Sequence, residues 1–360
     1  MRDSFRFRQE VGELVTILRG KPRVLITAPA VADGDSVGSQ LALEHMFHRV
    51  FPDVEVRIVN DEPPAERYRT VTGIERLLTP ETLAERGETL TFDVGIAVDG
   101  GIDRAGRLFE VFDRCKHRIF IDHHAISCPY PYSLSIVSPQ ATSATEIIYA
   151  ISRLAPFRTP LVPRFAEWLY LGLVCDTAVF RNPNTTPEVL ELAATLRRSG
   201  FDAIRHGHDV MTERSVAGLR LLADTVTRAQ FECEGRVVWS TVMQAQLDRF
   251  GGCPDDREGI VDALMTTRGV EVAALLFELP DGGTKVSMRS RGLIDVAALA
   301  ESLGSGGGHR KAAGAEMSLR PSDAAGMILR KLEDELAAED AASQRPLRRE
   351  GEALPCGLTF

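Results

Sequence analysis

The chain has 360 residues, more than a single domain usually holds, so two domains are expected. Its composition, 44% hydrophobic and 26% charged, is that of an ordinary globular protein. The formal net charge of −9 argues against a long electrostatic track along duplex nucleic acid. A small phosphorylated ligand stays compatible with this charge, because metal ions and a few local cations can bind it.

Cysteine usage and the N-terminal segment indicate the compartment. The six cysteines form neither a C-x-x-C pair nor a regular framework. The segment MRDSFRFRQE is charged and shows no secretory pattern, so a cytoplasmic protein is expected. No apolar run reaches the roughly 20 residues that a bilayer requires, so no membrane segment is expected.

Residues 1–200 alternate apolar runs with amphipathic stretches. Strands are expected at residues 23–30, 54–60, 92–99 and 118–124. Helices are expected at residues 36–50, 143–154, 164–177 and 187–200, the last ending at Gly200. This alternation predicts an α/β domain with a mostly parallel sheet flanked by helices.

A second pattern follows a helical connector expected at residues 201–225. Alternating strands with hairpin turns are predicted in residues 226–242 and 270–292, and helices at residues 256–267, 294–304 and 322–340. Residues 226–340 are therefore expected to form a smaller α+β domain. The polar stretch 341–360 is expected to be a tail.

Acidic and histidine side chains gather where predicted strands end. They are Asp33 and Asp35 after the first strand, Asp99 after the third, Asp122, His123 and His124 after the fourth, and Asp176 after a later apolar stretch. In open α/β sheets the binding crevice lies at the carboxyl ends of the strands, so one shared cleft is expected. Carboxylates a few ångströms apart repel each other and need protons or cations. The mixed Asp/His set favours Mn²⁺, with Mg²⁺ as the alternative.

Gly34 is expected to let a tight loop direct Asp33 and Asp35 into one site, where each can serve a different ion. Two ions about 3.5–4 Å apart are the usual arrangement for phosphoester hydrolysis. Taken alone, Asp-Gly-Asp is usually an ordinary turn, and Asp99 before two glycines has the same explanation. The Asp-His-His triplet is far more specific, and four such elements in this order favour a metal site.

These residues resemble the DHH phosphoesterase superfamily. The resemblance rests on Asp33-Gly34-Asp35 with Gly38-Ser39, on Asp99, on Asp122-His123-His124 and on Asp176-Thr177. Gly306-Gly307-Gly308-His309, continuing RKAAG, is similar to the signature of the DHH-associated C-terminal domain. The likeness reaches to about residue 320. The layout resembles the bifunctional oligoribonuclease/phosphoadenosine-phosphate phosphatase group, the nano-RNases.

The resemblance implies two metal ions. One is implied to bind Asp33 and Asp99, and the other to bind Asp35, Asp99, His123 and Asp176, with Asp99 bridging. His124 is implied to face the substrate phosphate, and Asp122 to orient its neighbours.

The first motif departs from the family in one position. A histidine ligand normally stands four residues before the first aspartate, where this chain has Pro29, and Ala32 replaces a usual proline. His45 and His48 on the following helix are better explained as ordinary helix-face residues. The first metal site is therefore expected to be weak, completed by water, or absent at low metal concentration.

The C-terminal domain carries candidate substrate contacts. Arg289 and Arg291 are two apart in a predicted strand, so both are expected on one face, where guanidinium groups can hold phosphate oxygens. A glycine-rich loop at Gly306, Gly307 and Gly308 is expected to bring backbone N–H groups to an anion beside His309. The resemblance implies that Ser287, Arg289 and His309 anchor the nucleotide. A structural turn with two solvated arginines is the alternative explanation.

Arg181, five residues after Asp176, is a further candidate phosphate contact. The sequence thus predicts a phosphoester hydrolase with two divalent ions that releases nucleoside monophosphates from short RNA or DNA oligonucleotides. 3′-Phosphoadenosine 5′-phosphate is a second expected substrate. A homodimer is compatible with the sequence.

Two alternatives remain open. One is hydrolysis of cyclic or linear dinucleotides, which the same fold and metals would serve. The other is a nucleotide-binding protein whose catalysis Pro29 impairs. Inorganic pyrophosphatase and a RecJ-type exonuclease are disfavoured, the first by the glycine-rich signature and the second by the short acidic chain.

Overall fold

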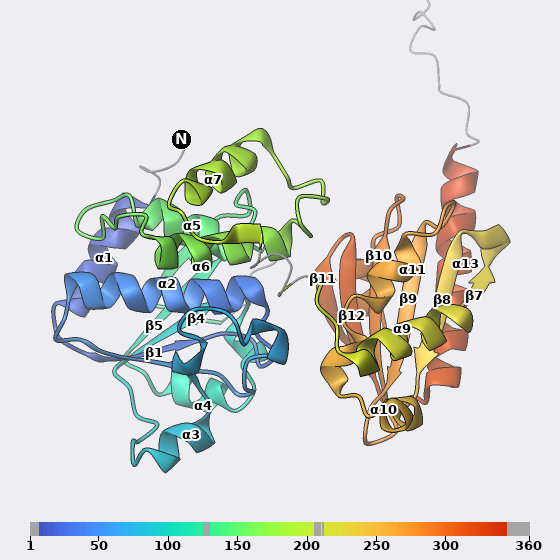
Figure 1. The fold of residues 1–360 in the computed structure, drawn as a ribbon, viewed down its shortest axis with the longest axis horizontal. Helices are drawn as coiled ribbons and strands as arrows, with labels where there is room; N and C mark the ends of the chain where they lie inside the picture. Colours follow the sequence, from blue (N-terminus) through green and yellow to red (C-terminus); the bar gives the residue numbers. More distant parts are fainter. Residues whose placement is uncertain (1–6, 125–129, 205–209, 211, 344–360) are drawn as a thin grey trace, which may run out of the picture. The chain divides into compact units, whose positions relative to one another are not determined.

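The computed structural model describes residues 7–124, 130–204, 210 and 212–343 (Figure 1). The chain divides into two compact units, Met1–Glu213 and Arg214–Phe360. The division falls within the segment expected to be a connector, part of which lies outside the described residues. Among the described helices, none combines the length and the apolar character that a bilayer span requires.

The first unit is built on a six-stranded parallel sheet with the order β3-β2-β1-β4-β5-β6. Its strands are β1 (Arg23–Thr27), β2 (Glu55–Val59), β3 (Leu77–Leu78), β4 (Val94–Val98), β5 (His117–Asp122) and β6 (Leu134–Val137). Every residue of β4 is buried, as expected for a parallel strand covered on both faces. The α/β fold class predicted from the sequence is confirmed.

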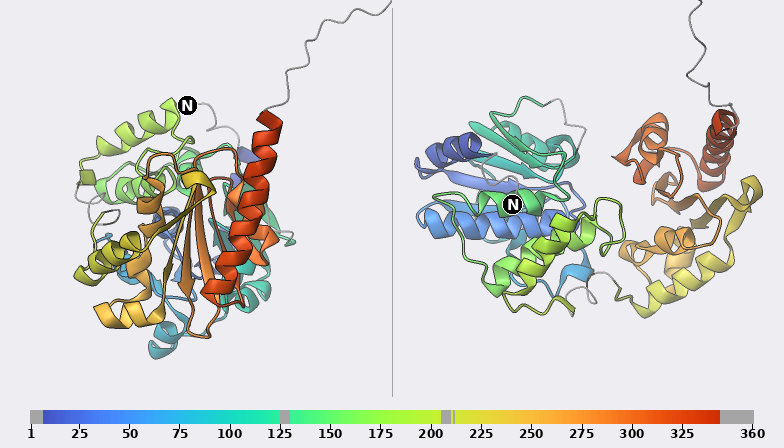
Figure 2. Two further views of the ribbon diagram at one scale, coloured as in Figure 1. Left: turned by 90° about the vertical axis from the view of Figure 1, so that its right-hand side faces the viewer. Right: turned by 90° about the horizontal axis from the view of Figure 1, so that it is seen from above.

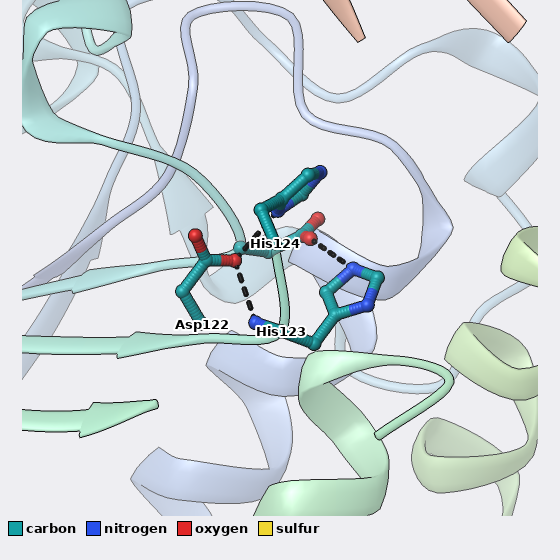
Figure 3. Close-up of side chains that lie close together, drawn as sticks. Asp122, His123 and His124 are labelled. Carbon is teal, nitrogen blue, oxygen red and sulfur yellow. Dashed lines mark hydrogen bonds and ion pairs between the residues drawn. The ribbon is translucent and has the colours of Figure 1, made fainter. Parts of the chain in front are cut away.

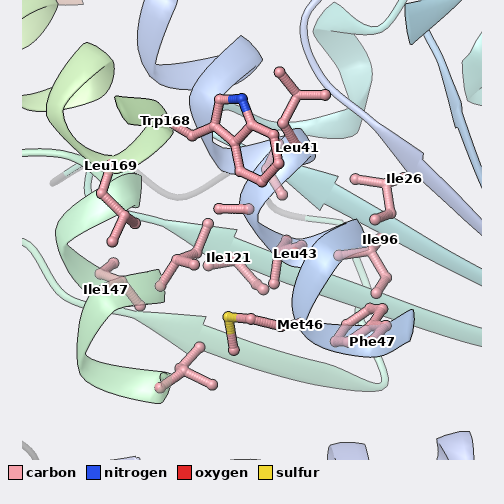
Figure 4. Packing of buried hydrophobic residues seen from close by; sticks show 14 of the residues in the cluster. Ile26, Leu41, Leu43, Met46, Phe47, Ile96, Ile121, Ile147, Trp168 and Leu169 are labelled. Atoms are coloured by element: carbon pink, nitrogen blue, oxygen red, sulfur yellow. The ribbon is translucent and has the colours of Figure 1, made fainter. Parts of the chain in front are cut away.

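Helices cover both faces of this sheet. They are α1 (Arg8–Leu18), α2 (Gly34–Val50), α3 (Pro80–Glu85), α4 (Leu108–Asp113), α5 (Ala144–Ile151), α6 (Pro163–Asp176) and α7 (Pro187–Arg197). Ile26 and Ile96 pack with α2 and α6, as Figure 4 shows for the side chains around Trp168. Leu25 and Ala97 point to the opposite face, toward α3 and α4, because successive strand residues alternate in direction.

The strand order reverses between β1 and β4. The chain leaves β1 toward β2 and β3 on one side, whereas β4, β5 and β6 extend the sheet on the other. In open α/β sheets such a reversal opens a crevice at the carboxyl ends of the strands. Asp33 follows β1, Asp99 follows β4 and Asp122 ends β5, so the fold brings the predicted acidic residues to this edge.

The second unit has a mixed six-stranded sheet with the order β11-β12-β10-β9-β8-β7, in which only the β8–β9 pair is parallel. Its strands are β7 (Gln230–Glu232), β8 (Val237–Val242), β9 (Val272–Glu278), β10 (Thr284–Ser290), β11 (Ser305–His309) and β12 (Ala312–Met317). Its helices are α9 (Val216–Thr227), α10 (Gln244–Phe250), α11 (Ile260–Met265), α12 (Val296–Ser302) and α13 (Pro321–Ser343).

The second sheet is also covered on both faces. Val272, Ala274 and Leu276 of β9 pack with α12 and α13, the long C-terminal helix that Figure 2 shows along one face. Leu275 and Phe277 point the other way, into the core formed with α9, α10 and α11. The helix expected at residues 256–267 is interrupted, because Gly259 has a φ of +69° and separates the 3-10 turn Pro254–Arg257 from α11.

Candidate metal centre and active site

Asp33 and Asp35 lie at the start of α2. Asp33 is the N-cap residue, and its Oδ1 accepts hydrogen bonds from the N–H groups of Asp35 and Ser36 at 2.9 and 3.0 Å. Gly34 is the first residue of the helix, and a Cβ there would overlap Cys175 Sγ on α6. The expectation of a tight loop is therefore wrong. Glycine is required at this position because α6 comes so close to α2.

Asp35 is buried and held by a second helix. Its Oδ2 accepts a hydrogen bond from the N–H of Ala144 at 2.5 Å, and its Oδ1 accepts one from Thr145 at 2.9 Å. Both donors lie in the first turn of α5, where the helix dipole favours a carboxylate. Gly172 on α6 provides the space, since a Cβ there would overlap Asp35 Oδ1.

Asp99 occupies a strained backbone position directly after β4. Its φ is +56°, a left-handed conformation that costs energy for a residue with a side chain. The Asp99 N–H donates to the carbonyl oxygen of Ile121 on β5 at 3.0 Å. Ser36 Oγ donates to Asp99 Oδ2 at 2.6 Å. Neighbours on β5 and α2 therefore fix the strained residue, as is common at functional sites.

Four side chains converge on one point beside His123. Its Nε2 lies 3.3 Å from Asp176 Oδ2, 3.5 Å from Asp99 Oδ1 and 3.9 Å from Asp35 Oδ2. One potential ligand atom from each of the four residues lies within 4.8 Å of the others. These are the four residues that the family resemblance assigned to one ion.

Asp176 provides a test of whether a metal ion fits. Its Oδ2 is buried and, apart from the contact with His123 Nε2, has no hydrogen-bond partner among the described residues, a state that is rare for a buried polar atom. Asp176 is also the last residue of α6, where the helix dipole disfavours negative charge. A divalent cation would satisfy both the oxygen and the charge, so the residues fit a metal ion.

Burial also raises the free energy of the ionised cluster when no cation is bound. Burial raises the pKa of Asp99 and Asp176 well above the usual range, and repulsion from neighbouring carboxylates adds to the effect. Burial likewise raises the pKa of Asp35. The pKa of His123 is lowered by burial, so its neutral, metal-binding form is favoured. A bound cation would favour the ionised carboxylates.

Asp122 holds both histidines of the triplet (Figure 3). Its buried Oδ1 accepts a hydrogen bond from the His123 N–H at 2.8 Å and lies 2.7 Å from His124 Nδ1. Burial opposes a charge on His124, but the bond to Asp122 outweighs it, and the pKa of His124 is raised. Nδ1 faces Asp122, so Nε2 lies on the opposite side of the imidazole ring. Asp99, Asp122, His123 and His124 form a second group of close potential ligands.

The second unit presents arginines from β10 and the residue after it. Arg289 Nε donates to Asp262 Oδ1 at 2.8 Å, and Arg291 Nη2 donates to the carbonyl oxygen of Met265 at 2.7 Å. Both partners belong to α11, so the two arginines face the same side, as expected from their spacing. They are anchored side chains rather than freely solvated ones.

The expected glycine-rich loop is a strand. Gly306, Gly307 and Gly308 belong to β11, an edge strand paired with β12, so the loop expectation is wrong. A Cβ on Gly306 would overlap the carbonyl oxygen of Ala300, because α12 packs directly on the strand. Gly308 has a φ of +140°, which disfavours a side chain.

Gly307 has a different environment from its neighbours. A Cβ at this position would meet no atom within 4 Å. In the strand register Gly307 pairs with Gly314, which pairs with Ser287 on β10. His309 and Arg289 both pair with Ala312, two residues further along the strands. The register thus brings together the residues that the resemblance assigned to nucleotide anchoring, around an open position at Gly307.

Comparison with known proteins identifies the family. Residues 23–173 match the model described as DHH family, N-terminal domain, and residues 237–338 match the DHHA1 domain. A relative from Bacillus subtilis (strain 168), named bifunctional oligoribonuclease and PAP phosphatase NrnA, is 30% identical over 333 residues, 89% of this chain and 97% of that protein. The chain belongs to the DHH family. It is a hydrolase acting on phosphoester bonds.

Two further likenesses extend over most of the chain. A Thermus thermophilus protein of the same name is 27% identical over 313 residues, covering 85% of this chain and 87% of the relative. The crystal structure of an exopolyphosphatase-related protein from Bacteroides fragilis has a TM-score of 0.82 at 20% identity, covering 92% of this chain and 98% of that one. The structural likeness shows the shared fold.

Pro29 stands where the family's first motif normally has a histidine. Pro29 packs against the turn after β4, since its Cγ lies 2.7 Å from where a Cβ on Gly100 would be. The potential ligand groups found among the described residues contain neither His45 nor His48. His45 instead contacts the rings of Phe165 and Trp168, and His48 is exposed. Asp33 is likewise outside both groups, so its role as a metal ligand stays a prediction.

Arg181 lies in the exposed turn after α6. Its Nε donates to the carbonyl oxygen of Ala178 at 2.7 Å. Ala178, Val179 and Phe180 all have positive φ angles, so this turn is strained next to Asp176. The expected phosphate contact of Arg181 stays a prediction.

Two positioning features were not identified from the sequence. Ser36 orients Asp99, and the first turn of α5 binds Asp35. The sequence contains a sign of each feature. Ser36 directly follows Asp35, and Ser143 is a typical N-cap residue, which in the structure accepts a hydrogen bond from the N–H of Glu146. Which carboxylate a helix N-terminus meets depends on tertiary packing, which the local pattern does not specify.

Proposed function

We propose that this DHH-family hydrolase releases nucleoside monophosphates from oligonucleotides a few nucleotides long. We also propose 3′-phosphoadenosine 5′-phosphate as a second substrate and two divalent ions, Mn²⁺ before Mg²⁺, as cofactors. The observation that carries the proposal is the convergence of Asp35, Asp99, His123 and Asp176, with one carboxylate oxygen left unsatisfied. The names of the two relatives, which refer to oligoribonucleotides and PAP, support the substrate class.

Different residues of the protein are assigned to ion binding and to proton donation. Asp35, Asp99, His123 and Asp176 would hold one ion, and Asp33 with Asp99 would hold the other more weakly. When bound, such ions activate water and neutralise charge on a phosphate. His124, whose protonated form the bond to Asp122 favours, donates a hydrogen bond or proton to the leaving oxygen.

The second unit contributes phosphate binding. Arg289 has its guanidinium fixed by Asp262, so little side-chain entropy is lost when it binds an anion. Ser287 lies in the row that leads to Gly307, where the surface is open. We assign a phosphate of the nucleotide to this face, with His309 and Arg291 as further contacts.

A reducing compartment agrees with the cysteines. Cys115, Cys175, Cys233 and Cys253, the cysteines within the described residues, form no disulfide bond with one another. A cytoplasmic location is therefore proposed, as expected from cysteine usage.

Product analysis tests the function. The protein is incubated with Mn²⁺ and a 5′-phosphorylated dinucleotide, a longer RNA, a cyclic dinucleotide, or 3′-phosphoadenosine 5′-phosphate, with Asp99→Ala as the control. Rapid monophosphate release from the dinucleotide, lost in the control, is the expected result. Preferred cleavage of the cyclic compound would replace the proposal with a cyclic-dinucleotide phosphodiesterase. Binding without turnover of any compound would leave a nucleotide-binding protein.

A further inference from the structure

Arg104 is a free cation beside the acidic cluster. It is the last residue of the 3-10 turn Ile102–Arg104, which follows the turn at Asp99 and Gly100. Its side chain is exposed, and within the described part of the chain its guanidinium makes no hydrogen bond or ion pair. Nη1 lies 3.8 Å from the position that a Cβ on Gly100 would take. An unpaired guanidinium therefore stands next to the residue that follows Asp99.

The backbone fixes Arg104 beside Pro29. The Ala30 N–H donates to the carbonyl oxygen of Arg104 at 2.8 Å, which ties the two segments together. The Pro29 ring and the Arg104 guanidinium both approach the space above Gly100. Arg104 thus stands where the site lacks a ligand, because Pro29 has no donor atom.

Arg104 differs from a neighbouring arginine in how its guanidinium is paired. A neighbouring arginine shows the contrast: Arg107 is engaged by the carboxylates of Asp61 and Glu81. With the described residues Arg104 forms no such ion pair, so its planar guanidinium can receive an incoming anion.

We propose that Arg104 binds the phosphate undergoing cleavage and supplies positive charge on the Pro29 side of the site, where metal ligands are sparse. This inference rests on the proposed function, because it assigns a residue to the substrate phosphate. The guanidinium offers two N–H donors to phosphate oxygens and, unlike an ion, needs no ligands. Arg104 therefore compensates for a weak first metal site.

Substitution of Arg104 by glutamine tests the proposal with two readouts. Arg104→Gln keeps the backbone bond to Ala30 and removes the charge. Binding of inorganic phosphate to the Mn²⁺-loaded protein, measured by calorimetry, is expected to weaken about tenfold or more. The kcat/KM for the dinucleotide is expected to fall in parallel, while Mn²⁺ affinity at the four-residue site stays unchanged. Arg104→Lys is expected to be intermediate, because it keeps the charge without the planar fork.

Arg114→Gln is the matched control. Arg114 is an exposed arginine in the same unit that pairs with Glu110 at 3.1 Å, away from the cluster. The control is expected to bind phosphate as the unaltered protein does. Adding Pro29→His to Arg104→Gln is expected to recover activity and phosphate binding at high Mn²⁺, because the histidine would strengthen the first ion.

The outcomes separate this inference from the proposed function. If Arg104→Gln binds phosphate and cleaves the dinucleotide like the control, while Asp99→Ala is inactive, Arg104 has no phosphate role and the function stands. If the unaltered protein cleaves nothing in the panel but its phosphate binding depends on Arg104, the proposed function fails and the phosphate site stands.

Discussion

The two sheets of this protein build their sites in opposite ways. The parallel sheet gathers carboxylates at the ends of β4 and β5 and at the start of α2, and buries them with like charges nearby. The mixed sheet places Arg289 on the surface of a strand and anchors it to Asp262. The buried carboxylates need a cation to be stable. Arg289 is already neutralised by Asp262, and the surface of the second sheet is open at Gly307.

The contrast has a consequence for substitutions. Changes in the acidic cluster should alter metal binding, stability and chemistry together, because the charges repel each other without an ion. Changes on the second sheet should separate affinity from stability, since the positions proposed to face a ligand and the packing positions are different residues.

The largest effect is expected from Asp176→Asn and Asp35→Asn. Each removes a ligand from the four-residue group, so activity should fall by about a thousandfold or more. Their metal-free stabilities should move in opposite directions. Asp176→Asn removes a buried, unsatisfied charge and should raise the melting temperature, whereas Asp35→Asn loses a carboxylate that accepts two α5 hydrogen bonds. Equal melting temperatures for the two metal-free variants would contradict the different roles assigned here.

Gly306→Ala and Gly307→Ala should separate packing from ligand binding on β11. Gly306→Ala places a methyl group against the Ala300 carbonyl and should cost about 2–3 kcal/mol in the free energy of unfolding, measured with urea. Gly307→Ala meets open space and should leave stability nearly unchanged, but should weaken binding of adenosine monophosphate several-fold. If both variants bind the nucleotide normally, the assignment of this face to a phosphate is wrong.

Gly34→Ala should destabilise the first unit by about 1–3 kcal/mol, because its methyl group overlaps Cys175. Adding Cys175→Ala should recover most of the loss. Gly12→Ala in α1 is the matched control, since nothing lies within 4 Å of its Cβ position. That control should stabilise by about 0.5–1 kcal/mol through helix propensity alone. If Gly34→Ala left the free energy of unfolding unchanged, α2 and α6 would be able to move apart.

The smallest effect expected is a pH dependence of metal binding. The pKa of Asp99 and Asp176 is raised, so the stability from their protonated forms is present at low pH and lost as pH rises through the raised pKa. Bound Mn²⁺ keeps both groups ionised. Stabilisation by Mn²⁺ should therefore grow with pH, by about 1.4 kcal/mol per pH unit for each proton displaced. Thermal unfolding with and without Mn²⁺ across pH tests this, and a difference that shrinks with pH contradicts it.

Sequence periodicity was enough to predict the α/β fold of the first unit and the edge at which its acidic residues meet. Apolar runs such as residues 94–98 read directly as buried strands, and the carboxyl ends of parallel strands share one edge. Asp99 and His123 could therefore be placed together from their positions in the chain, and the Asp-His-His triplet indicated the family.

The roles of individual glycines in packing and of individual arginines in ion pairing depend on the tertiary structure. Gly34 and Gly306 read as loop residues in the sequence, yet each allows a helix to pack closely, on α2 and on β11 respectively. Arg289 is anchored, whereas Arg104 has no side-chain partner among the described residues, and the local sequence does not distinguish the two. The reason is physical. Local periodicity is set by neighbours a few residues away, whereas close approach and ion pairing depend on atoms from segments far apart in the chain.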